Sequence, residues 1–487
     1  MARPSLQKHR IFRDLATTTE LLLRPTPLME LLVLLALLLL GGLSVFIRRR
    51  TAHPALAVVS DPAVAHGVLI DDADAFADRP VPHFVVTLAR SRGGQRNENI
   101  SSAPHGPHWR ALRRNITSET LHPSRLGPAH LAPLHRDAIQ DLVAALSAGA
   151  RAGKVVALQP VHHIRTSVFR VAVRLCFGDG VDERHVRAIC SEVHGTQVAI
   201  GGVQPSMLAR LAEWIYLGRL LAFHDRVTAL CLPLIAARRR RTRDDELCRP
   251  YVDSLIDLRV REGCAGGARR ALRDNEIVDL VLEFLGASTG SSVACLEWTL
   301  AHLVAQPEVQ ERLRREVDGA ADGSQQLIRG MPYLHAVILE SLRMHPPTPV
   351  AVRHVQADAA ATLTTAVPAD GGLTVLFHLG DMGRDGKTWK DPHEFRPERF
   401  LPGGDAEGVG PLPGPKEARM MPFGAGHRFC PGVGLAMATI KCFLAALVRE
   451  FEWAPPTTNG AVDFTELDGF LKTMRKPLSA RLTPRTK

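Results

Sequence analysis

One cysteine lies in a glycine-rich loop that could present a thiolate to a metal. Cys430 and Arg428 stand in the run Phe-Gly-Ala-Gly-His-Arg-Phe-Cys-Pro-Gly, here called the cysteine loop (residues 423–432). A thiolate can bind haem iron, and a guanidinium two residues away could reach a haem propionate. A lone cysteine is more often a small core residue, so the surrounding pattern carries the prediction. Its glycines allow positive φ values and close approach of the backbone to a flat ligand. They are Gly424, Gly426 and Gly432, and Phe423 opens the loop.

A second candidate region is a run of small and hydroxyl-bearing residues inside an apolar stretch. The apolar pattern that begins at Asp274 predicts an N-capped amphipathic helix running to Gln306. Its middle reads Gly-Ala-Ser-Thr-Gly-Ser-Ser and is here called the serine-rich segment (residues 286–292). Such side chains allow a groove and a local break in the hydrogen-bond ladder, as a helix that crosses a flat cofactor needs. The alternative is a tolerated polar patch on a packed helix.

Two further pairs of residues have helical spacing. Glu340 and Arg343 share one face of a helix that we expect to begin near Pro332. Trp109 and Arg113 are four positions apart on another. Each pair alone is weak evidence, because surface ion pairs are common and contribute little, and arginine is usually solvated.

Together these motifs resemble those of the cytochrome P-450 monooxygenases. The cysteine loop matches the family's Phe-x-x-Gly-x-Arg-x-Cys-x-Gly, and Trp109 to Arg113 matches its Trp-x-x-x-Arg. Residues 332–347 resemble its K helix, and residues 395–400 resemble the segment that supplies a third charged partner. The similarity extends from about Ala55 to the C-terminus, and it looks like plant A-type microsomal members, most of all the family numbered eighty-nine.

The resemblance implies a fold and a set of roles. The fold class would be mainly α with small β-sheets (α+β), the P-450 fold, with one haem-binding catalytic domain over residues 55–487. Cys430 would be the axial ligand of haem b, within a loop whose Phe423, Gly424, Arg428 and Gly432 border the cofactor. Trp109 and Arg113 would bind a propionate, with Arg353 or His354 as a lesser candidate. A buried triad behind the haem would consist of Glu340, Arg343 and Arg399. Substrate contacts would come from residues 80–107, 196–222, 284–291, 348–354 and the loop near Phe470 and Leu471.

The chain departs from the family pattern in the serine-rich segment. The usual Ala/Gly-Gly-x-Asp/Glu-Thr aligns with residues 287–291, so that Gly290 replaces the acid and Ser291 replaces the threonine. Ser291 keeps a hydroxyl that can donate a hydrogen bond to dioxygen. Proton delivery must then run through water or Thr289. We therefore expect a coupled but weakened monooxygenase, with Ser291 and Thr289 as its catalytic candidates.

The N-terminal region also differs from the family. Residues 28–47 carry a single charge and are long enough to span a bilayer, after an N-terminal extension at residues 1–27. Arg48 to Arg50 follow, which favours a cytosolic side for everything downstream, although basic residues also precede the span. A cleaved signal peptide is the alternative. Relatives carry a hinge, a helix and a strand before the region near Ala55, and without them we expect an uncovered sheet edge.

Net charge, cysteine spacing and the short predicted elements describe the rest of the chain. The net charge of +10 suits an acidic partner or an anionic membrane surface, and no nucleic-acid-binding motif accompanies it. The eight cysteines are scattered, which fits a reducing environment. Short strands are expected at residues 55–60 and 373–379, a loop at 402–415, and an exposed helix end at Arg238 to Arg241.

The first functional hypothesis is a single-pass endoplasmic reticulum enzyme with a cytosolic catalytic domain. It would draw electrons from NADPH-cytochrome P-450 reductase and insert one atom of O2 into an apolar small molecule. A haem-thiolate isomerase, dehydratase or peroxide-using enzyme is the second hypothesis. The third is a relative that has lost function.

Overall fold

A computed structural model describes residues 56–485 with several gaps. The gaps are residues 82–84, 87–88, 90–96, 152–157, 202–208, 241–248, 262–267, 320–329, 357–362, 364–371, 415–416, 458–459 and 468. The chain divides into two units, Met1–Leu56 and the larger Ala57–Lys487. The predicted extension at 1–27 and the predicted membrane span at 28–47 lie outside the described residues.

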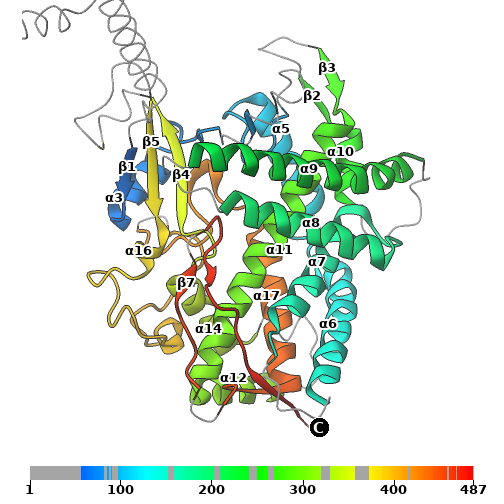
Figure 1. Cartoon of the computed structure of the whole chain (residues 1–487). Coiled ribbons are helices and arrows are strands. Elements are labelled where there is room, and N and C mark those ends of the chain that lie inside the picture. Colours follow the sequence, from blue (N-terminus) through cyan, green and yellow to red (C-terminus); the bar gives the residue numbers. More distant parts are fainter. Residues whose placement is uncertain are drawn as a thin grey trace, which may run out of the picture. The chain divides into compact units, whose positions relative to one another are not determined.

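The larger unit is organised around one long helix, α11 (Asp274–Ala305). It packs against α7 (Val161–Phe177), α17 (Val433–Glu450) and α14 (Pro332–Met344), which lie beside it in Figure 1. Apolar residues cover most of its circumference, and Ile277, Leu285 and Trp298 are fully buried. The sequence predicted an amphipathic helix, and this prediction is wrong because neighbours surround α11 on nearly every side.

The other helices complete the α part of the fold. Their bounds are α3 (Pro62–His66), α5 (Pro107–Asn115), α6 (Pro128–Arg151), α8 (Glu183–Gly201), α9 (Ala209–Arg240), α10 (Tyr251–Asp257), α12 (Pro307–Gly319) and α16 (Leu379–Gly383). Proline occupies the first position of α12 and of α14, where its missing N–H costs nothing. The predicted start of a helix near Pro332 is confirmed.

The β structure is small, with four sheets among the described residues. The largest has the order β1 (Leu56–Val59), β5 (Leu373–His378), β4 (Val350–Val355). The two-stranded sheets pair β2 (Arg259–Arg261) with β3 (Arg269–Ala271), β6 (Phe451–Ala454) with β9 (Arg481–Pro484), and β7 (Glu466–Leu467) with β8 (Thr473–Met474). The two strands predicted from sequence are confirmed, and residues 402–414 form turns and bends as expected.

The three-stranded sheet ends on β1 among the described residues. Leu56 and Val58 on this edge strand are 59% and 60% exposed. Apolar side chains on an open edge strand are unusual. The expectation of an uncovered edge concerns the chain before Leu56, which lies outside the described residues, so it stays a prediction.

Two local predictions about α11 need correction. Its cap is Arg273, whose backbone N–H donates to the Glu276 carboxylate at 2.8 Å, so Asp274 is the first helical residue. The helix is continuous through the serine-rich segment, without the expected break in its ladder. The hydroxyls of Ser288, Ser291 and Ser292 instead donate to carbonyls one turn earlier.

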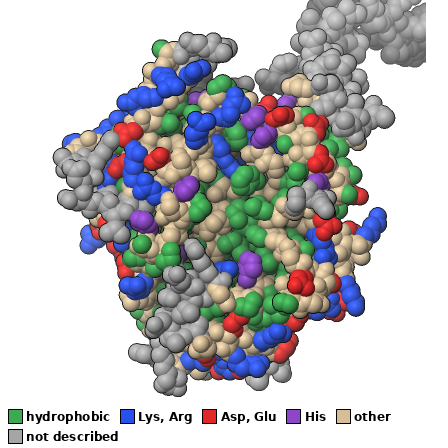
Figure 2. Space-filling model, turned by 180° about the vertical axis from the view of Figure 1, so that it is seen from behind, with side chains coloured by type: hydrophobic (Ala, Val, Ile, Leu, Met, Phe, Trp, Pro, Cys, Tyr) green, Lys and Arg blue, Asp and Glu red, His purple; other side chains and the backbone are tan. Residues whose placement is uncertain are grey.

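The surface is basic without forming one continuous patch on the face in Figure 2. Lys and Arg lie mainly around its rim among Asp and Glu, and hydrophobic side chains gather near the centre. Arg238 was expected to be exposed, but its side chain is 8% exposed and pairs with Asp253 at 2.5 Å. Arg239 and Arg240 are exposed at the end of α9, as predicted.

Two described helices are long and apolar enough to cross a membrane. They are Gly218–Arg240 and Asp274–Ala305, and the second is α11, which is mostly buried in the protein. Length and composition alone are weak evidence, because a core helix passes the same test.

Candidate active site

The cysteine loop is closed by its own backbone. The N–H of Cys430 donates to the Phe423 carbonyl at 2.8 Å, and the N–H of Gly424 donates to the Met421 carbonyl at 2.8 Å. Gly424 and Gly426 have φ values of 71° and 67°, which favour glycine. At Gly426 a Cβ would also lie 2.2 Å from the Leu69 carbonyl oxygen, so the loop and that segment are in direct contact.

The prediction of a positive φ at Gly432 is wrong. Its φ is −88°, and it precedes the first residue of α17. A Cβ there would lie 3.7 Å from Cys430 Sγ, an ordinary contact. Gly432 therefore acts through its backbone N–H, which hydrogen-bonds the Cys430 sulfur at the start of a helix.

Opposing influences act on the Cys430 thiol. Burial raises its pKa, whereas the Gly432 N–H and the guanidiniums of Arg113 and Arg79 act to lower it. The three latter groups favour negative charge on sulfur. A metal ion in place of the proton would therefore meet a sulfur already provided with compensating partners.

The guanidiniums of Arg79 and Arg113 act on this sulfur, and those of Arg353 and Arg428 lie close to Arg79. Burial is the largest influence on each, and it lowers the pKa of Arg353 to about 9 and that of Arg428 to about 10. Mutual repulsion within the cluster adds to the effect: Arg79 acts on both of these residues and on Arg113. The nearby carboxylates are Asp78 and Glu283. We call the four arginines, Arg79, Arg113, Arg353 and Arg428, the arginine cluster.

Arg428 and Trp109 fix this region to the rest of the chain. Arg428 donates to the carbonyls of Ala77, Ile100 and Ala103 at 2.7, 2.9 and 2.7 Å, with its guanidinium carbon 4.6 Å above the Trp109 ring. Trp109 Nε1 donates to the Ile100 carbonyl at 3.1 Å. Contacts of these two residues with a haem propionate stay predictions.

The remaining predicted propionate partners lie on two elements. Arg113, on α5, places its guanidinium carbon 4.6 Å above the Phe429 ring. Arg353, on β4, is buried and donates to the Ala425 carbonyl at 3.1 Å. His354, the next residue of β4, bonds through its backbone N–H to the Asp78 carbonyl. Of the two alternatives on β4, the structure thus brings the Arg353 side chain to the cysteine loop.

The donors in this region fit haem. Arg79 Nε is buried without a hydrogen-bond partner among the described residues, an arrangement that is costly unless an anion binds there. A ligand with two carboxylates would satisfy the surplus of guanidiniums. No cluster of three or more His, Cys, Asp or Glu side chains suited to a metal occurs in the described part of the chain. A flat iron-bearing group with one sulfur ligand and two carboxylates suits this combination.

The three residues predicted as a charged triad lie together in the core. Glu340 accepts from Arg343 at 2.7 and 2.8 Å and from Arg399 Nε at 2.9 Å. The side chains of all three are 0% exposed. Backbone carbonyls, among them those of Gly383 and Pro392, take further N–H groups of Arg343. Because its members are buried and hydrogen-bonded, this triad fixes the position of the segment that precedes the cysteine loop.

The serine-rich segment presents its hydroxyls on different sides. Ser291 is half-buried and its hydroxyl donates to the Ala287 carbonyl at 2.8 Å, on a face where Ala287 is exposed. Thr289 is 4% exposed, and its hydroxyl has no hydrogen-bond partner among the described residues. The roles of Ser291 and Thr289 in proton delivery stay predictions.

Two residues beside the site were missed from the sequence. Arg79 joins the other three arginines of the cluster from a segment without a recognised motif, and Gln197 on α8 donates through Nε2 to the Gly286 carbonyl at 2.8 Å. Gln197 falls within the predicted substrate segment 196–222, but nothing in the local sequence singled it out, whereas Leu471 was named with the predicted substrate loop. The pairing of Arg79 with Cys430 depends on segments about 350 positions apart, which no local pattern reveals.

Comparison with known proteins decides the family. The family model for cytochrome P450 matches residues 46–481. The chain belongs to the cytochrome P450 family. Members of this family are haem-thiolate monooxygenases, which use O2, a small-molecule substrate and a redox partner, and their haem iron carries a cysteine thiolate.

Plant P450s are among the similar proteins. Cytochrome P450 89A9 of Arabidopsis thaliana is 32% identical over 446 residues, which cover 88% of this chain and 84% of that protein. Cytochrome P450 78A11 of Oryza sativa subsp. japonica is 32% identical over 450 residues, covering 88% and 77%. The predicted resemblance to plant P450s, including family eighty-nine, is confirmed.

A solved structure confirms the P450 fold. A zebra fish cytochrome P450 with progesterone has a TM-score of 0.71 at 23% identity, covering 89% of this chain and 95% of that one. The predicted mainly α architecture with small sheets is therefore correct.

Proposed function

We propose that this P450 is a membrane-anchored, haem b-dependent monooxygenase that inserts one oxygen atom into an apolar small molecule. The observation that carries the proposal is Cys430 beside the arginine cluster. When bound, thiolate-ligated haem iron supplies activation of dioxygen and cleavage of its oxygen–oxygen bond. The chain's own residues hold the sulfur, neutralise the cofactor's carboxylates and supply the hydroxyl of Ser291.

Each part of this site has a separate task. Cys430 is the proposed metal ligand, with Phe423, Gly424 and Gly432 shaping the loop around it. Arg79 and the other members of the arginine cluster are the proposed carboxylate partners, with Trp109 packed against Arg428. The triad around Glu340 holds the framework. These assignments divide the site into residues that retain haem and residues that guide the reaction.

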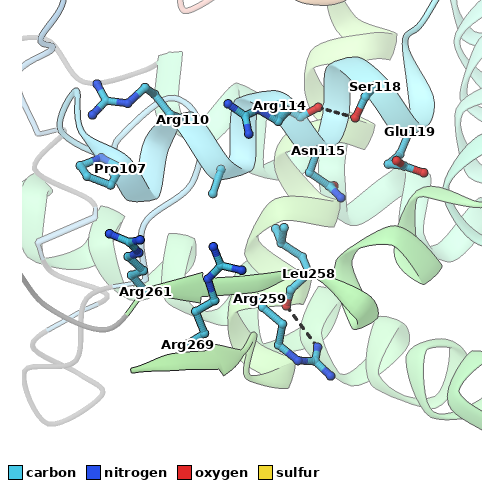
Figure 3. A pocket seen from close by; sticks show the side chains of 11 residues that line it. Pro107, Arg110, Arg114, Asn115, Ser118, Glu119, Leu258, Arg259, Arg261 and Arg269 are labelled. Carbon is cyan, nitrogen blue, oxygen red and sulfur yellow. Dashed lines mark hydrogen bonds between the residues drawn. The ribbon is translucent and has the colours of Figure 1, made fainter. Parts of the chain in front are cut away.

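Electrons would arrive from NADPH through a flavoprotein, NADPH-cytochrome P-450 reductase. A pocket of about 500 Å³ lies between α5 and the β2–β3 hairpin and supports docking of an acidic surface. Figure 3 shows arginine side chains from both elements around it; these are Arg110, Arg114, Arg259, Arg261 and Arg269. Glu119, the one carboxylate of this lining, already pairs with Arg249 at 3.1 Å. Opposite charges would favour docking with an acidic face.

The docking surface can be tested separately from the chemistry. In a reconstituted mixture with the reductase, Arg110→Glu combined with Arg114→Glu should raise the half-saturating reductase concentration about tenfold at low salt. Arg136→Glu, at an exposed position on α6, is the matched control. Equal effects of the pocket variant and the control would contradict this docking site.

We place the proposed membrane span at residues 28–47, after the extension at 1–27, with the catalytic domain at 55–487 facing the cytosol from the endoplasmic reticulum. The apolar run and the basic residues after it support this arrangement. A version without residues 1–47 should leave the membrane fraction after salt extraction, whereas the full chain should remain there. Equal partition of both would contradict a single anchor at this position.

The missing carboxylate at Gly290 favours a second candidate, a haem-thiolate enzyme that uses peroxide or performs isomerisation or dehydration without delivered protons. Turnover of the same substrate with hydrogen peroxide and without NADPH would support it. Turnover that requires NADPH, reductase and O2 supports the monooxygenase.

A further inference from the structure

The glycine at position 290 is not required by its own backbone. Gly290 lies within the continuous helix α11 and is not among the residues with positive φ. Glycine inside a helix costs about 1 kcal/mol relative to alanine. Another feature of the molecule must therefore explain why no side chain stands here.

Side chains from two other elements occupy the space above Gly290. A Cβ at this position would lie 2.6 Å from Leu471 Cδ1, 2.8 Å from Gln197 Nε2 and 3.0 Å from Gln197 Oε1. Leu471 follows β7, and Gln197 belongs to α8. All three distances are shorter than van der Waals contact, so a side chain at 290 and the present positions of these neighbours exclude one another.

Gln197 rests on two glycines of α11, one helical turn apart. Its Nε2 donates to the Gly286 carbonyl at 2.8 Å, and a Cβ at Gly286 would lie 3.4 Å from the same nitrogen. Gly286 and Gly290 together leave room for the amide. The absence of side chains at Gly286 and Gly290 is therefore linked to the position of the Gln197 amide.

We propose that Gln197 is a positioning residue of this site, which supplies from α8 the hydrogen-bonding group that α11 lacks at position 290. The proposal rests on the monooxygenase function proposed above. One N–H of the amide binds Gly286, and among the described residues Gln197 Oε1 accepts no hydrogen bond. The oxygen and the second N–H remain available for a water molecule or a polar group of the substrate.

An amide differs from a carboxylic acid in what it can do. It orients a hydrogen-bonded partner but does not release a proton near neutral pH. Proton delivery at this P450 would therefore depend on water held by Gln197 rather than on an acid of α11. The arrangement predicts partial coupling of electron use to product, between that of an acid-bearing site and that of an entirely apolar one.

The first test measures whether Gln197 and Gly290 are coupled, and it needs neither substrate nor reductase. Gly290→Ala should raise the Tm of the holoprotein less than the helix propensity of alanine predicts, because the ends of the Gln197 and Leu471 side chains must shift. Adding Gln197→Ala should recover the part of that deficit that the amide causes. Gly218→Ala on α9, where a Cβ would meet nothing within 4 Å, is the control and should show the full rise. Additive effects of Gly290→Ala and Gln197→Ala would overturn the proposed pairing.

The second test measures positioning. Gln197→Leu should raise hydrogen peroxide formed per NADPH about three- to tenfold, as expected for one lost hydrogen bond, with an unchanged reduced carbon monoxide spectrum. Gln197→Glu should keep peroxide at or below the original level, and so should Gly290→Asp with Gln197→Ala. An unchanged peroxide yield in Gln197→Leu would overturn the positioning role and leave Gln197 as packing alone.

Failure of the proposed function gives a different result, because the unaltered protein would then form no NADPH-dependent product. In that case the readout is the rate at which chemically reduced holoprotein returns to the ferric state in air-saturated buffer. Gln197→Leu should change that rate at least threefold, and an equal rate would overturn the proposal.

Discussion

The cysteine loop and the serine-rich segment position reactive groups in different ways. The loop is held by bonds among its own residues, such as that from the Cys430 N–H to the Phe423 carbonyl. At the serine-rich segment, the groups around Gly290 come from three elements: α8, α11 and the loop after β7. A loop that is closed by its own backbone and fixed to its neighbours through Arg428 tolerates few changes, whereas a composite surface can exchange one contributor for another. We therefore expect that changes around the cysteine loop (the cysteine side) cause abrupt losses of haem. Changes around the serine-rich segment (the α11 side) should cause graded changes in the coupling of electron use to product formation.

The largest expected effect on the cysteine side comes from Glu340→Gln. The change leaves two buried guanidiniums without their carboxylate, at a cost of about 3–5 kcal/mol. We expect almost no haem in the purified chain, measured as haem absorbance per unit of protein.

Glu311→Gln is the matched control for this change. Glu311 also pairs with an arginine three positions later, Arg314, but on α12, where the Glu311 side chain is 43% exposed. Normal haem content is expected there. Similar haem contents in both variants would show that burial of the triad does not matter for cofactor retention.

A smaller effect is expected from Arg79→Leu, and it should differ between the haem-bound and haem-free states. Loss of one charge-assisted partner should weaken haem retention about tenfold. The haem-free chain should lose little or no stability, because Arg79 Nε is buried without a partner and Nη2 makes only a 3.4 Å bond to the Arg428 carbonyl. Haem transfer to apomyoglobin and the Tm of the haem-free chain measure the two effects.

Arg428→Leu sharpens that prediction within the same cluster. Arg428 bonds three backbone carbonyls, so its loss should destabilise the haem-free chain as well. If Arg79→Leu destabilised the haem-free chain as much as Arg428→Leu does, Arg79 would be structural and the ligand-binding explanation would be wrong.

These two sides also differ in how far the sequence predicted them. The cysteine loop, the K-helix region and the strands near 56 and 373 follow from local patterns, because their key residues are close together in the chain. Arg79 and Gln197 act through contacts between distant segments, which a single sequence does not encode locally. The predicted positive φ at Gly432 was wrong for a related reason. Gly432 has ordinary torsion angles, and its role is to place its backbone N–H beside the Cys430 sulfur.

On the α11 side, Ser291→Ala should raise peroxide formed per NADPH about threefold, with haem content unchanged. The half-buried hydroxyl of Ser291 is the proposed donor, and its loss removes one hydrogen bond. Ser292→Ala is the control, because Ser292 also donates to a carbonyl one turn earlier but is 2% exposed. Equal peroxide yields in the two variants would mean that the face of α11 does not select the reactive hydroxyl.

The smallest effect concerns how α11 begins. Burial acts to raise the pKa of Glu276, but hydrogen bonds from Arg270 and Arg273 outweigh it and lower that pKa to about 2 from an ordinary 4.5. The ionised Glu276 carboxylate therefore stabilises the folded chain fully above about pH 4.5, and this stabilisation is lost as the pH falls toward 2. Glu276→Gln should lower stability by about 1–3 kcal/mol near neutral pH and by progressively less in acid. A difference in Tm between the two proteins that does not shrink with falling pH would contradict this assignment.

The central claim is that Cys430 provides the sulfur ligand of a haem held by the arginine cluster. Its most direct test is the absorption spectrum of the reduced protein with carbon monoxide, for the original chain, Cys430→Ser and the buried-cysteine control Cys442→Ser. We predict the long-wavelength Soret band of thiolate-bound haem in the original chain and in Cys442→Ser, and its absence in Cys430→Ser. Persistence of that band in Cys430→Ser, or its absence from the haem-loaded original chain, would contradict the account.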